Sequence, residues 1–310
     1  MKLRYLLMLL PLPALAAITP RPLSAIPDDA FGAKVRQGYQ LFVNTQQLRG
    51  SYVGNDLNCS NCHMDAGRKA NAAPLWGSWF AYPAFRKKNN KINSFEMRLQ
   101  GCFTYSMNGK APPSGSPELL ALAAYAYWLG MGSLTPADQP VPEASDTVLR
   151  EGGQAKDFTP PAGWTKDTLK ALPGRGYPKL AAQKVDIERG RAVYTAHCAL
   201  CHGPDGQGRK MADRVVFPPL WGPNSFNWGA GMHRVNTAAG FIHANMPLGQ
   251  SMQLTEQQAW DVAAFMDSHS RPQDPRFDGD IEKTRSQFHQ HQGYYGQPMT
   301  DESPPEGKQQ

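Results

Sequence analysis

Two stretches of the chain, Cys59-Ser60-Asn61-Cys62-His63 and Cys198-Ala199-Leu200-Cys201-His202, share the pattern Cys-x-x-Cys-His. This pattern is typical of c-type haem attachment, in which the two thiols bond to the vinyl groups of the haem. The alternatives are a zinc knuckle and a redox-active cysteine pair. Two copies in similar surroundings favour haem. We therefore predict two covalent haem c groups, held by Cys59 and Cys62 and by Cys198 and Cys201, with His63 and His202 as iron ligands.

One further cysteine needs its own explanation. The chain has five cysteines, and the two motifs use four of them. Cys102 therefore has no partner for an intramolecular disulfide. The alternatives are a buried structural thiol, which is common for free cysteine, and a thiol with a chemical role.

Residues 1–17 have the composition of a secretory signal peptide. Lys2 and Arg4 form a positive amino-terminal region, Leu6–Leu15 is apolar, and small residues at 14–16 suit cleavage. The alternative is an uncleaved anchor, although the apolar stretch is short and interrupted by proline. Because covalent haem is attached outside the bacterial cytoplasm, we expect a periplasmic protein whose mature chain has no membrane span.

The charge of the chain is moderately positive. The formal net charge is +6, and removal of Lys2 and Arg4 with the signal peptide would lower it by two. This excess is too small to indicate nucleic-acid binding, and the sequence contains no nucleic-acid motif. A mild positive charge is compatible with an anionic substrate or an acidic redox partner.

The chain resembles a degenerate duplication. Each half has a helix with a glycine and an aromatic residue before its haem motif, and an apolar helix at its end. The glycine and the aromatic residue are Gly38 and Tyr39 in the first half and Gly190 and Tyr194 in the second. The closing helices are predicted over 117–131, with Ser116 as N-cap, and over 255–268, with a capping box from Thr255 to Gln258. Short helices and long loops around one haem resemble class I cytochrome c domains. The expected fold class is therefore mainly α, with two such domains, each wrapped round one covalent haem.

This organisation divides the chain into five segments. Residues 136–182 are rich in proline and glycine, but aromatic and leucine anchors favour an ordered wrapping linker. The last segment is polar and proline-punctuated, so we expect it to be extended and partly disordered. The predicted segments are 1–17 (signal peptide), 18–135 (haem 1 and active site), 136–182 (linker), 183–270 (haem 2, electron transfer) and 271–310 (polar tail).

The second iron needs a distal ligand, and Met246 is the first candidate. It follows His202 by 44 residues and lies in the stretch Met246-Pro247-Leu248-Gly249, before the closing helix. A thioether is a soft, neutral ligand that raises the haem potential. The alternatives are that Met246 only packs, and that one of Met252, Met232, His243 and His233 is the ligand.

The first half has no Met-Pro loop at the corresponding place. Cys102 lies 39 residues after His63 and before the Ser116-capped helix, where a distal ligand is expected. A thiolate is a strong donor and would depress the haem potential. If Cys102 is only a buried thiol, Met107 or Met97 would ligate this iron.

With these residues in place, the chain resembles the thiosulfate dehydrogenase family of dihaem cytochromes. The resemblance covers nearly the whole mature chain. It rests on the two haem motifs, on Cys-Phe-x-x-Ser-Met-Asn-Gly at 102–109, which is the most specific part, and on Asn-Met-Pro-Leu-Gly at 245–249. The family joins two thiosulfates into tetrathionate and releases two electrons, and some members work better in reverse.

The resemblance also implies ligands. An active-site haem with His/Cys ligation maps to His63 and Cys102, and an electron-exit haem maps to His202 and Met246. Some members have a lysine beside this methionine that exchanges as ligand. Here Asn245 stands at that place, so the exchange is not expected.

The expected chemistry requires positive charge beside Cys102. Two thiosulfate dianions must meet near one iron, and fixed cations offset their repulsion. Arg98, four residues before Cys102, is the first candidate, because a guanidinium donor fork suits a sulfonate face. The further candidates are Arg86, Lys87, Lys88, Lys91 and Lys110. The alternative, for at least half of those between Arg86 and Lys91, is a basic face that only meets solvent.

The predicted mechanism uses the Cys102 sulfur as the nucleophile. It bonds to one thiosulfate, and a second thiosulfate releases tetrathionate. Ser106 is predicted to orient the substrate through its hydroxyl, or else to cap a turn. Electrons would pass to a periplasmic acceptor such as a small cytochrome c or a high-potential iron–sulfur protein.

Three other functions compete with this one. A dihaem electron shuttle would need no thiol at haem 1. A cytochrome of the Sox sulfur-oxidation system also uses Cys-ligated haem, but conjugates thiosulfate onto a carrier protein. A dihaem peroxidase leaves the distal side of its peroxidatic haem open, which disfavours it here.

Overall fold

We describe the protein from a computed structural model, which describes residues 18–86, 89–151, 160–212 and 214–300. The predicted signal peptide, Lys87, Lys88 and Phe158 lie outside these residues. Over the described ranges the helices are α1 (Ala30–Val43), α2 (Met64–Gly67), α3 (Phe95–Gly101), α4 (Pro117–Leu134), α5 (Asp146–Glu151), α6 (Lys166–Lys170), α7 (Ile187–His197), α8 (Ala199–His202), α9 (Val235–Asn245), α10 (Glu256–Asp267) and α11 (Ile281–Phe288). Two small antiparallel hairpins accompany them, β1 (Ala84–Arg86) with β2 (Lys91–Asn93), and β3 (Arg209–Met211) with β4 (Arg214–Phe217).

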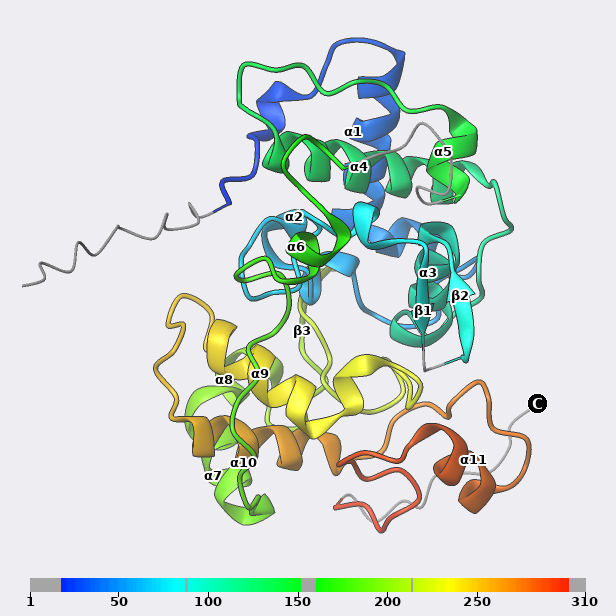
Figure 1. The fold of residues 1–310 in the computed structure, drawn as a ribbon. Helices are drawn as coiled ribbons and strands as arrows, with labels where there is room; N and C mark the ends of the chain where they lie inside the picture. The colour runs from blue at the N-terminus through cyan, green and yellow to red at the C-terminus, as the bar shows by residue number, and fades with distance from the viewer. Residues whose placement is uncertain (1–17, 87–88, 152–159, 213, 301–310) are drawn as a thin grey trace, which may run out of the picture.

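The amino-terminal half is built on the crossing of α1 and α4 (Figure 1). Asp29 caps α1 and Ser116 caps α4, each by accepting a hydrogen bond from a backbone N–H in the first turn. The helices approach closely at Gly38, where a Cβ atom would lie 1.9 Å from the carbonyl oxygen of Ala121. Only glycine therefore fits at this crossing.

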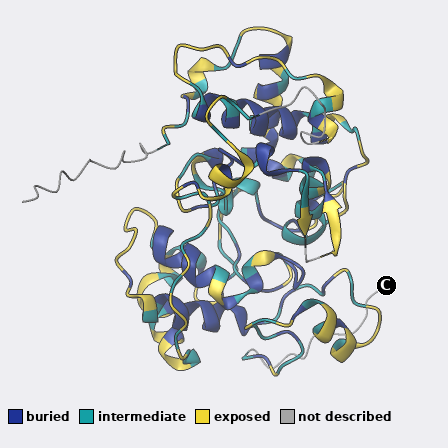
Figure 2. Ribbon diagram, viewed as in Figure 1, coloured by how far each residue is buried: buried dark blue, intermediate teal, exposed yellow. Residues whose placement is uncertain are grey.

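The carboxy-terminal half repeats this crossing with α7 and α10. A Cβ atom at Gly190 would lie 2.1 Å from the carbonyl oxygen of Asp261. The expected capping box is present at the start of α10, where the Thr255 side chain accepts from the Gln258 N–H. Figure 2 shows these crossing helices as the buried centres of the two halves, with the exposed residues mainly in loops and at helix ends. The duplication inferred from Gly38 and Gly190 is thus visible as a repeated helix crossing.

The segment between the halves packs along the molecule. Leu169 on α6 is fully buried and Leu172 is nearly so. The indole N–H of Trp164 donates to the carbonyl oxygen of Leu134 at 3.0 Å, which fixes the segment to the end of α4. These contacts bring residues 172–177 to the boundary between the two halves.

Buried asparagines join the two halves. The Asn227 Nδ2 atom donates to the Thr104 carbonyl oxygen at 2.9 Å and to the Asn108 Oδ1 atom at 3.0 Å. The Asn245 Nδ2 atom donates to the Asn71 carbonyl oxygen at 2.9 Å. Asn227 and Asn245 are both fully buried. Because a buried amide without partners is destabilising, these bonds favour one arrangement of the halves.

The polar carboxy-terminal segment differs from the expectation of an extended, partly disordered tail. Residues 271–300 contain α11 and return to the carboxy-terminal half (Figure 1). Tyr295 is 2% exposed and its ring lies 5.8 Å from the ring of fully buried Trp228. The composition indicates disorder because the segment has few aromatic residues and they are far apart in the sequence. The structure buries some of these residues, and their burial holds the segment in place. Residues 301–310 lie outside the described ranges.

In the described ranges, none of the helices combines the length and the apolar character needed to cross a bilayer.

Candidate active site

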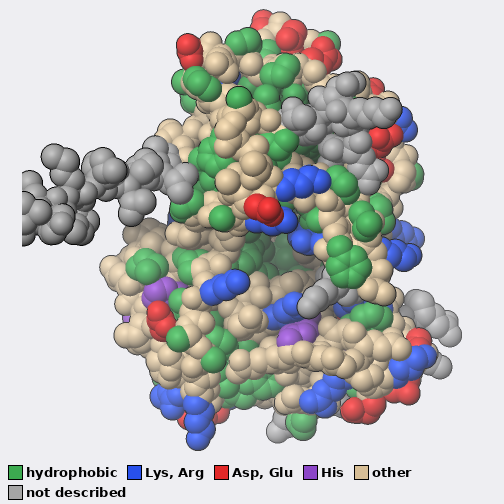
Figure 3. Space-filling view, viewed as in Figure 1, with side chains coloured by type: hydrophobic (Ala, Val, Ile, Leu, Met, Phe, Trp, Pro, Cys, Tyr) green, Lys and Arg blue, Asp and Glu red, His purple; other side chains and the backbone are tan. Residues whose placement is uncertain are grey.

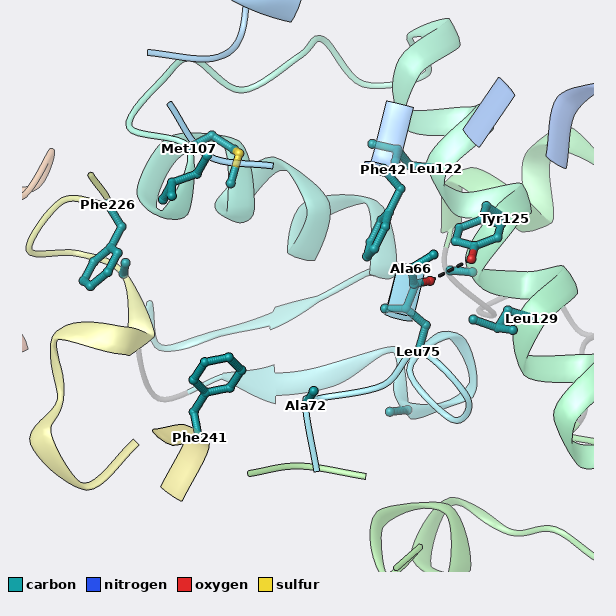
Figure 4. Close-up of a cluster of buried hydrophobic side chains, with 14 of the residues drawn as sticks. Phe42, Ala66, Ala72, Leu75, Met107, Leu122, Tyr125, Leu129, Phe226 and Phe241 are labelled. Carbon is teal, nitrogen blue, oxygen red and sulfur yellow. Dashed lines mark hydrogen bonds between the residues drawn. The ribbon is translucent and has the colours of Figure 1, made fainter. Parts of the chain in front are cut away.

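Two cavities lie beside the two haem motifs. The first is lined by Cys59, Cys62, His63 and Cys102, together with side chains from both halves of the chain. Figure 4 shows Phe42 and Leu122 on one side of this space and Phe226, from the other half, on the opposite side. The apolar walls and the convergent thiols and imidazole are the surroundings that a covalent haem requires.

The His63 ring is oriented to present one nitrogen to the cavity. Its Nδ1 atom donates to the Ala73 carbonyl oxygen at 2.6 Å, so the lone pair of the neutral ring is on Nε2. Burial lowers the pKa of His63, which keeps the ring neutral. This is the arrangement of an iron-ligating histidine, whose other N–H is held by a carbonyl group.

The second cavity repeats this arrangement. It is lined by Cys198, Cys201, His202 and Met246. The His202 Nδ1 atom donates to the Pro218 carbonyl oxygen at 2.9 Å, and burial lowers the pKa of His202. The chain therefore offers one neutral imidazole nitrogen to each cavity.

The candidates for the distal position at the second haem separate clearly. Met246 lines this cavity, and Met232 lies in its wall. Met252 is 60% exposed. His243 is buried but is not among the lining residues, and His233 belongs to another cluster, described below. Of the five candidates, the structure places only Met246 and Met232 at the cavity.

Cys102 lies at the junction of two kinds of helix. Ser94 caps α3, and α3 continues into the π-helical turn η5 (Cys102–Ser106). Such turns are rare in proteins, and those that occur are often found at functional sites. Met107, directly after this turn, also lines the first cavity, whereas Met97 is 38% exposed and is not among its lining residues. Of the three candidates, the structure therefore places Cys102 and Met107 in the cavity that His63 also lines.

Arg98 contacts the thiol directly. Its Nη1 atom donates to the Cys102 Sγ atom at 3.1 Å. The pKa of Arg98 is raised, chiefly by the charge of Cys102 as thiolate, against the opposing effect of burial. One turn of α3 separates the two residues, so the four-residue spacing noted in the sequence brings them together.

Two more arginines line the same cavity. Arg86 at the end of β1 is one of the basic residues proposed from the sequence. Arg175, in the segment between the halves, was not predicted to be at the site. Its pKa is lowered, mainly by burial. The sequence feature that could have drawn attention to Arg175 is its position between Gly174 and Gly176. The next residue, Tyr177, also lines the cavity.

Of the other basic residues proposed from the sequence, the two that the structure describes do not line this cavity. Lys91 and Lys110 are exposed and are not among its lining residues. Figure 3 shows a hollow between the upper and lower halves of the molecule with Lys and Arg side chains around it. The cavity beside Cys102 thus combines a thiol with three guanidinium groups, a suitable environment for a small multivalent anion.

Ser106 lines the cavity at the end of η5. Its carbonyl oxygen accepts a hydrogen bond of 2.8 Å from the Asn55 Nδ2 atom, which also donates to the Ser225 carbonyl oxygen at 3.1 Å. This bond fixes the backbone at Ser106 and leaves the direction of its hydroxyl to a substrate or to solvent.

The two cavities share a wall. Leu57, Cys62, Phe226 and Met232 line both of them. Cys62 belongs to the first haem motif, and Phe226 and Met232 belong to the other half of the chain. The two cavities are therefore neighbours, an arrangement that suits electron transfer between groups bound in them.

Comparisons with known proteins show the families to which the two halves of the chain are similar. The family model described as "SoxA/TsdA, cytochrome c domain" matches residues 51–133, and the model described as "Cytochrome c" matches residues 187–270. A thiosulfate dehydrogenase from Stutzerimonas stutzeri is 48% identical over 277 residues, which are 88% of this chain and 80% of that protein. The chain belongs to the thiosulfate dehydrogenase family.

Further comparisons extend over most of the chain. A thiosulfate dehydrogenase from Thiomonas intermedia is 49% identical, over 88% of this chain and 77% of that protein. The solved thiosulfate dehydrogenase TsdBA from Marichromatium purpuratum, in its "as isolated" form, has a TM-score of 0.79 at 43% identity. That match covers 93% of this chain and 57% of the solved chain.

Membership of the thiosulfate dehydrogenase family confirms the predicted fold class. The chain has two cytochrome c domains in a mainly helical structure, and they carry two covalently bound haem c groups. It is therefore an oxidoreductase with cytochrome electron transfer.

Proposed function

We propose that this protein couples two thiosulfate ions into tetrathionate in the periplasm, with the reaction taking place at Cys102. The observation that carries this proposal is the 3.1 Å contact between the Arg98 Nη1 atom and the Cys102 Sγ atom within the haem 1 cavity. A haem that serves only electron transfer has no use for a free thiol that contacts one arginine in a cavity lined by two more. The names of the relatives support thiosulfate as the substrate.

The ligand assignment follows from the two cavities. We infer that His63 and Cys102 would hold the iron of haem 1, and that His202 and Met246 would hold the iron of haem 2. The haems, when bound, take up the two electrons released for each tetrathionate. A thioether at haem 2 suits the exit of electrons, because it raises the potential of that haem above that of a thiolate-ligated haem.

The proposed reaction begins with the Cys102 thiolate. Its sulfur bonds to the outer sulfur of one thiosulfate, two electrons leave, and a cysteine S-thiosulfonate remains. The outer sulfur of a second thiosulfate then attacks the sulfur bonded to the sulfonate. The bond to Cys102 breaks, tetrathionate leaves, and the thiolate is restored. Sulfur, oxygen and charge are conserved in both steps.

The chain's own residues supply the electrostatic part of this reaction. The first adduct carries one negative charge and the attacking thiosulfate carries two, so their approach is repulsive. Arg98, Arg86 and Arg175 offset this repulsion from fixed positions in a cavity with apolar walls. Ser106 donates its hydroxyl to a sulfonate oxygen and so orients one of the two substrates.

Electrons leave through the apolar edge of haem 2. Leu200, between the two cysteines of the second motif, is 81% exposed, and Leu248, which lines the second cavity, is 61% exposed. Small apolar patches beside a haem suit the brief docking of electron carriers. We propose a small cytochrome c or a high-potential iron–sulfur protein as acceptor. Leu200→Glu should slow reduction of such a carrier without slowing reduction of ferricyanide.

The proposed function is tested by thiosulfate-dependent reduction of ferricyanide by the purified dihaem protein, with tetrathionate quantified. The expected result is one tetrathionate for every two ferricyanide ions reduced. No turnover in this direction and none with tetrathionate as oxidant would contradict the proposal and leave an electron shuttle as the better account. Amino-terminal sequencing of protein from a periplasmic fraction tests the location, with a mature end near residue 18 expected.

A further inference from the structure

Three histidines form a cluster away from both haem motifs. His233 ends the 3₁₀ turn η6 (Gly231–His233), and His289 and His291 follow α11 in the carboxy-terminal segment. The His233 Nε2 atom lies 2.8 Å from the His291 Nε2 atom and 3.1 Å from the His289 Nδ1 atom. One nitrogen of each ring lies within 4.8 Å of the others. His233 and His289 are buried, and His291 is partly exposed.

Hydrogen bonds fix which nitrogens carry lone pairs. The His233 Nδ1 atom donates to the Ala230 carbonyl oxygen, so the lone pair of the neutral ring is on Nε2. The His289 Nε2 atom lies 2.9 Å from the Asp274 Oδ2 atom. Arg276 donates to both oxygens of Asp274, at 2.9 Å from Nε and 2.5 Å from Nη2, which holds this group as a carboxylate. Asp274 therefore accepts from His289, and the lone pair of neutral His289 is on Nδ1.

Two lone pairs consequently face each other across 3.1 Å, with the Nε2 atom of His291 beside them. No proton lies between neutral His233 and His289 in these tautomers, so their contact is favourable only when a proton or a metal ion lies between the two nitrogens. We propose that this cluster is a binding site for a divalent transition-metal ion, with zinc as the ion that fits the donor set best. Three imidazole nitrogens and one open position are a common zinc arrangement.

The dimensions of the cluster suit this ion. Zinc–nitrogen bonds of about 2.0–2.1 Å in a tetrahedron place neighbouring nitrogens about 3.3 Å apart. The two contacts of His233, at 2.8 and 3.1 Å, therefore need to lengthen by only a few tenths of an ångström, and the third pair of nitrogens lies within 4.8 Å. The carbonyl group at Ala230 and the carboxylate at Asp274 are the outer partners that orient metal-bound imidazoles. The fourth position faces a cavity that Arg285 and Gln292 also line, so it suits water or an anion.

The site joins two parts of the chain that are distant in sequence. His233 follows Ala230 and Met232, which line the haem 1 cavity, whereas His289 and His291 belong to the carboxy-terminal segment. The His289 ring also stacks on Tyr295 at 4.1 Å. A bound ion would therefore fasten the carboxy-terminal segment to the loop that forms one wall of the active site, and its role would be structural.

Metal retention by the untagged, full-length dihaem protein tests this inference. The protein is treated with a chelator, dialysed against equimolar zinc and washed, and zinc is measured relative to iron. We expect one zinc for every two irons in the wild type and in His197→Gln, a control at an exposed histidine outside the cluster. His291→Ala, at the partly exposed ligand, should lower zinc affinity at least tenfold while haem content is retained.

A second variant tests the positioning role of Asp274. Asp274→Asn removes the charge that orients His289 and should weaken zinc binding about 10- to 100-fold, the range found for such outer partners. X-ray absorption at the zinc edge should show three imidazole nitrogens at about 2.0–2.1 Å. Equal zinc retention in the wild type and His291→Ala, or a spectrum with oxygen ligands only, would overturn the inference. None of these measurements depends on thiosulfate turnover, so the proposed function is tested separately.

Discussion

The Arg98 Nη1 atom lies 3.1 Å from the Cys102 Sγ atom, one turn along the helix that leads into the π-helical turn η5. This contact joins a guanidinium group of the cavity to the sulfur of the one cysteine that lies outside the haem motifs. A guanidinium held in this way can neutralise the thiolate and still offer its other N–H groups to an anion. The pair is the centre of the proposed active site.

Replacement of Arg98 should therefore impair the use of thiosulfate. Arg98→Gln removes a charge-assisted hydrogen bond worth about 1.5–3 kcal/mol, so kcat/KM should fall about 10- to 100-fold. The kcat/KM of Arg98→Lys should lie between the values of Arg98→Gln and the wild type, because lysine keeps the charge but lacks the donor fork. Steady-state kinetics with ferricyanide measure the effect. Lys110→Gln, at an exposed lysine in the same stretch of chain, is the control, and equal kinetics for it and Arg98→Gln would remove Arg98 from the site.

Arg175 should contribute in the same direction with a smaller effect. It lines the cavity, and the structure gives it no bond to Cys102 among those of the described residues. Arg175→Ala should raise the KM for thiosulfate several-fold with a smaller change in kcat, because it acts on the charge of the bound anion. Lys179→Ala, at a nearby exposed lysine outside the cavity, should leave both constants unchanged. A similar KM for Arg175→Ala and the wild type would contradict this role.

Met246 should determine the spectrum of haem 2. If its sulfur is the distal ligand, Met246→Gly should abolish the weak near-infrared band of sulfur-to-iron charge transfer and lower the haem 2 potential. Met252→Gly is the matched control, because Met252 is 60% exposed and lies outside the cavity. An unchanged near-infrared spectrum in Met246→Gly would assign the ligand to another residue, with Met232 as the next candidate.

The two helix crossings should be intolerant of any side chain. Gly38→Ala and Gly190→Ala place a Cβ atom about 2 Å from a carbonyl oxygen of the facing helix. Each should lower the free energy of unfolding by about 1–3 kcal/mol or more, the range for overpacked cores. Gly176→Ala has nothing within 4 Å of the new Cβ and should be close to neutral. Denaturant unfolding, monitored by circular dichroism, gives these free energies. Equal stability of all three variants would contradict the close helix contacts at Gly38 and Gly190.

Much of the helical framework could be predicted because its signals are local. The N-cap at Ser116, the capping box at Thr255 and the apolar spacing of the closing helices depend on residues three or four positions apart. The duplication could also be predicted, from the glycines at 38 and 190 and from the two haem motifs. The structure places α4 and α10 within a few residues of the predicted bounds.

The rest depends on contacts between distant parts of the chain. Arg175 reaches the site only because Leu169 and Leu172 fix the connecting segment to the amino-terminal half. Phe226 and Met232 lie in a loop of the other half, and no local pattern places them beside Cys62. The sequence predicts an extended, partly disordered carboxy-terminal segment, because its polar composition hides the few buried rings, such as that of Tyr295, that hold it in place.

The measurement that tests the central claim most directly is mass spectrometry of the fully oxidised protein after incubation with one equivalent of thiosulfate. The proposed reaction predicts the added mass of one thiosulfate on the peptide that contains Cys102, together with reduction of the haems. Cys102→Ala, with both haems attached, should show neither. No adduct on the wild type, or the same added mass in Cys102→Ala, would contradict the role of Cys102 as the residue that bonds to substrate.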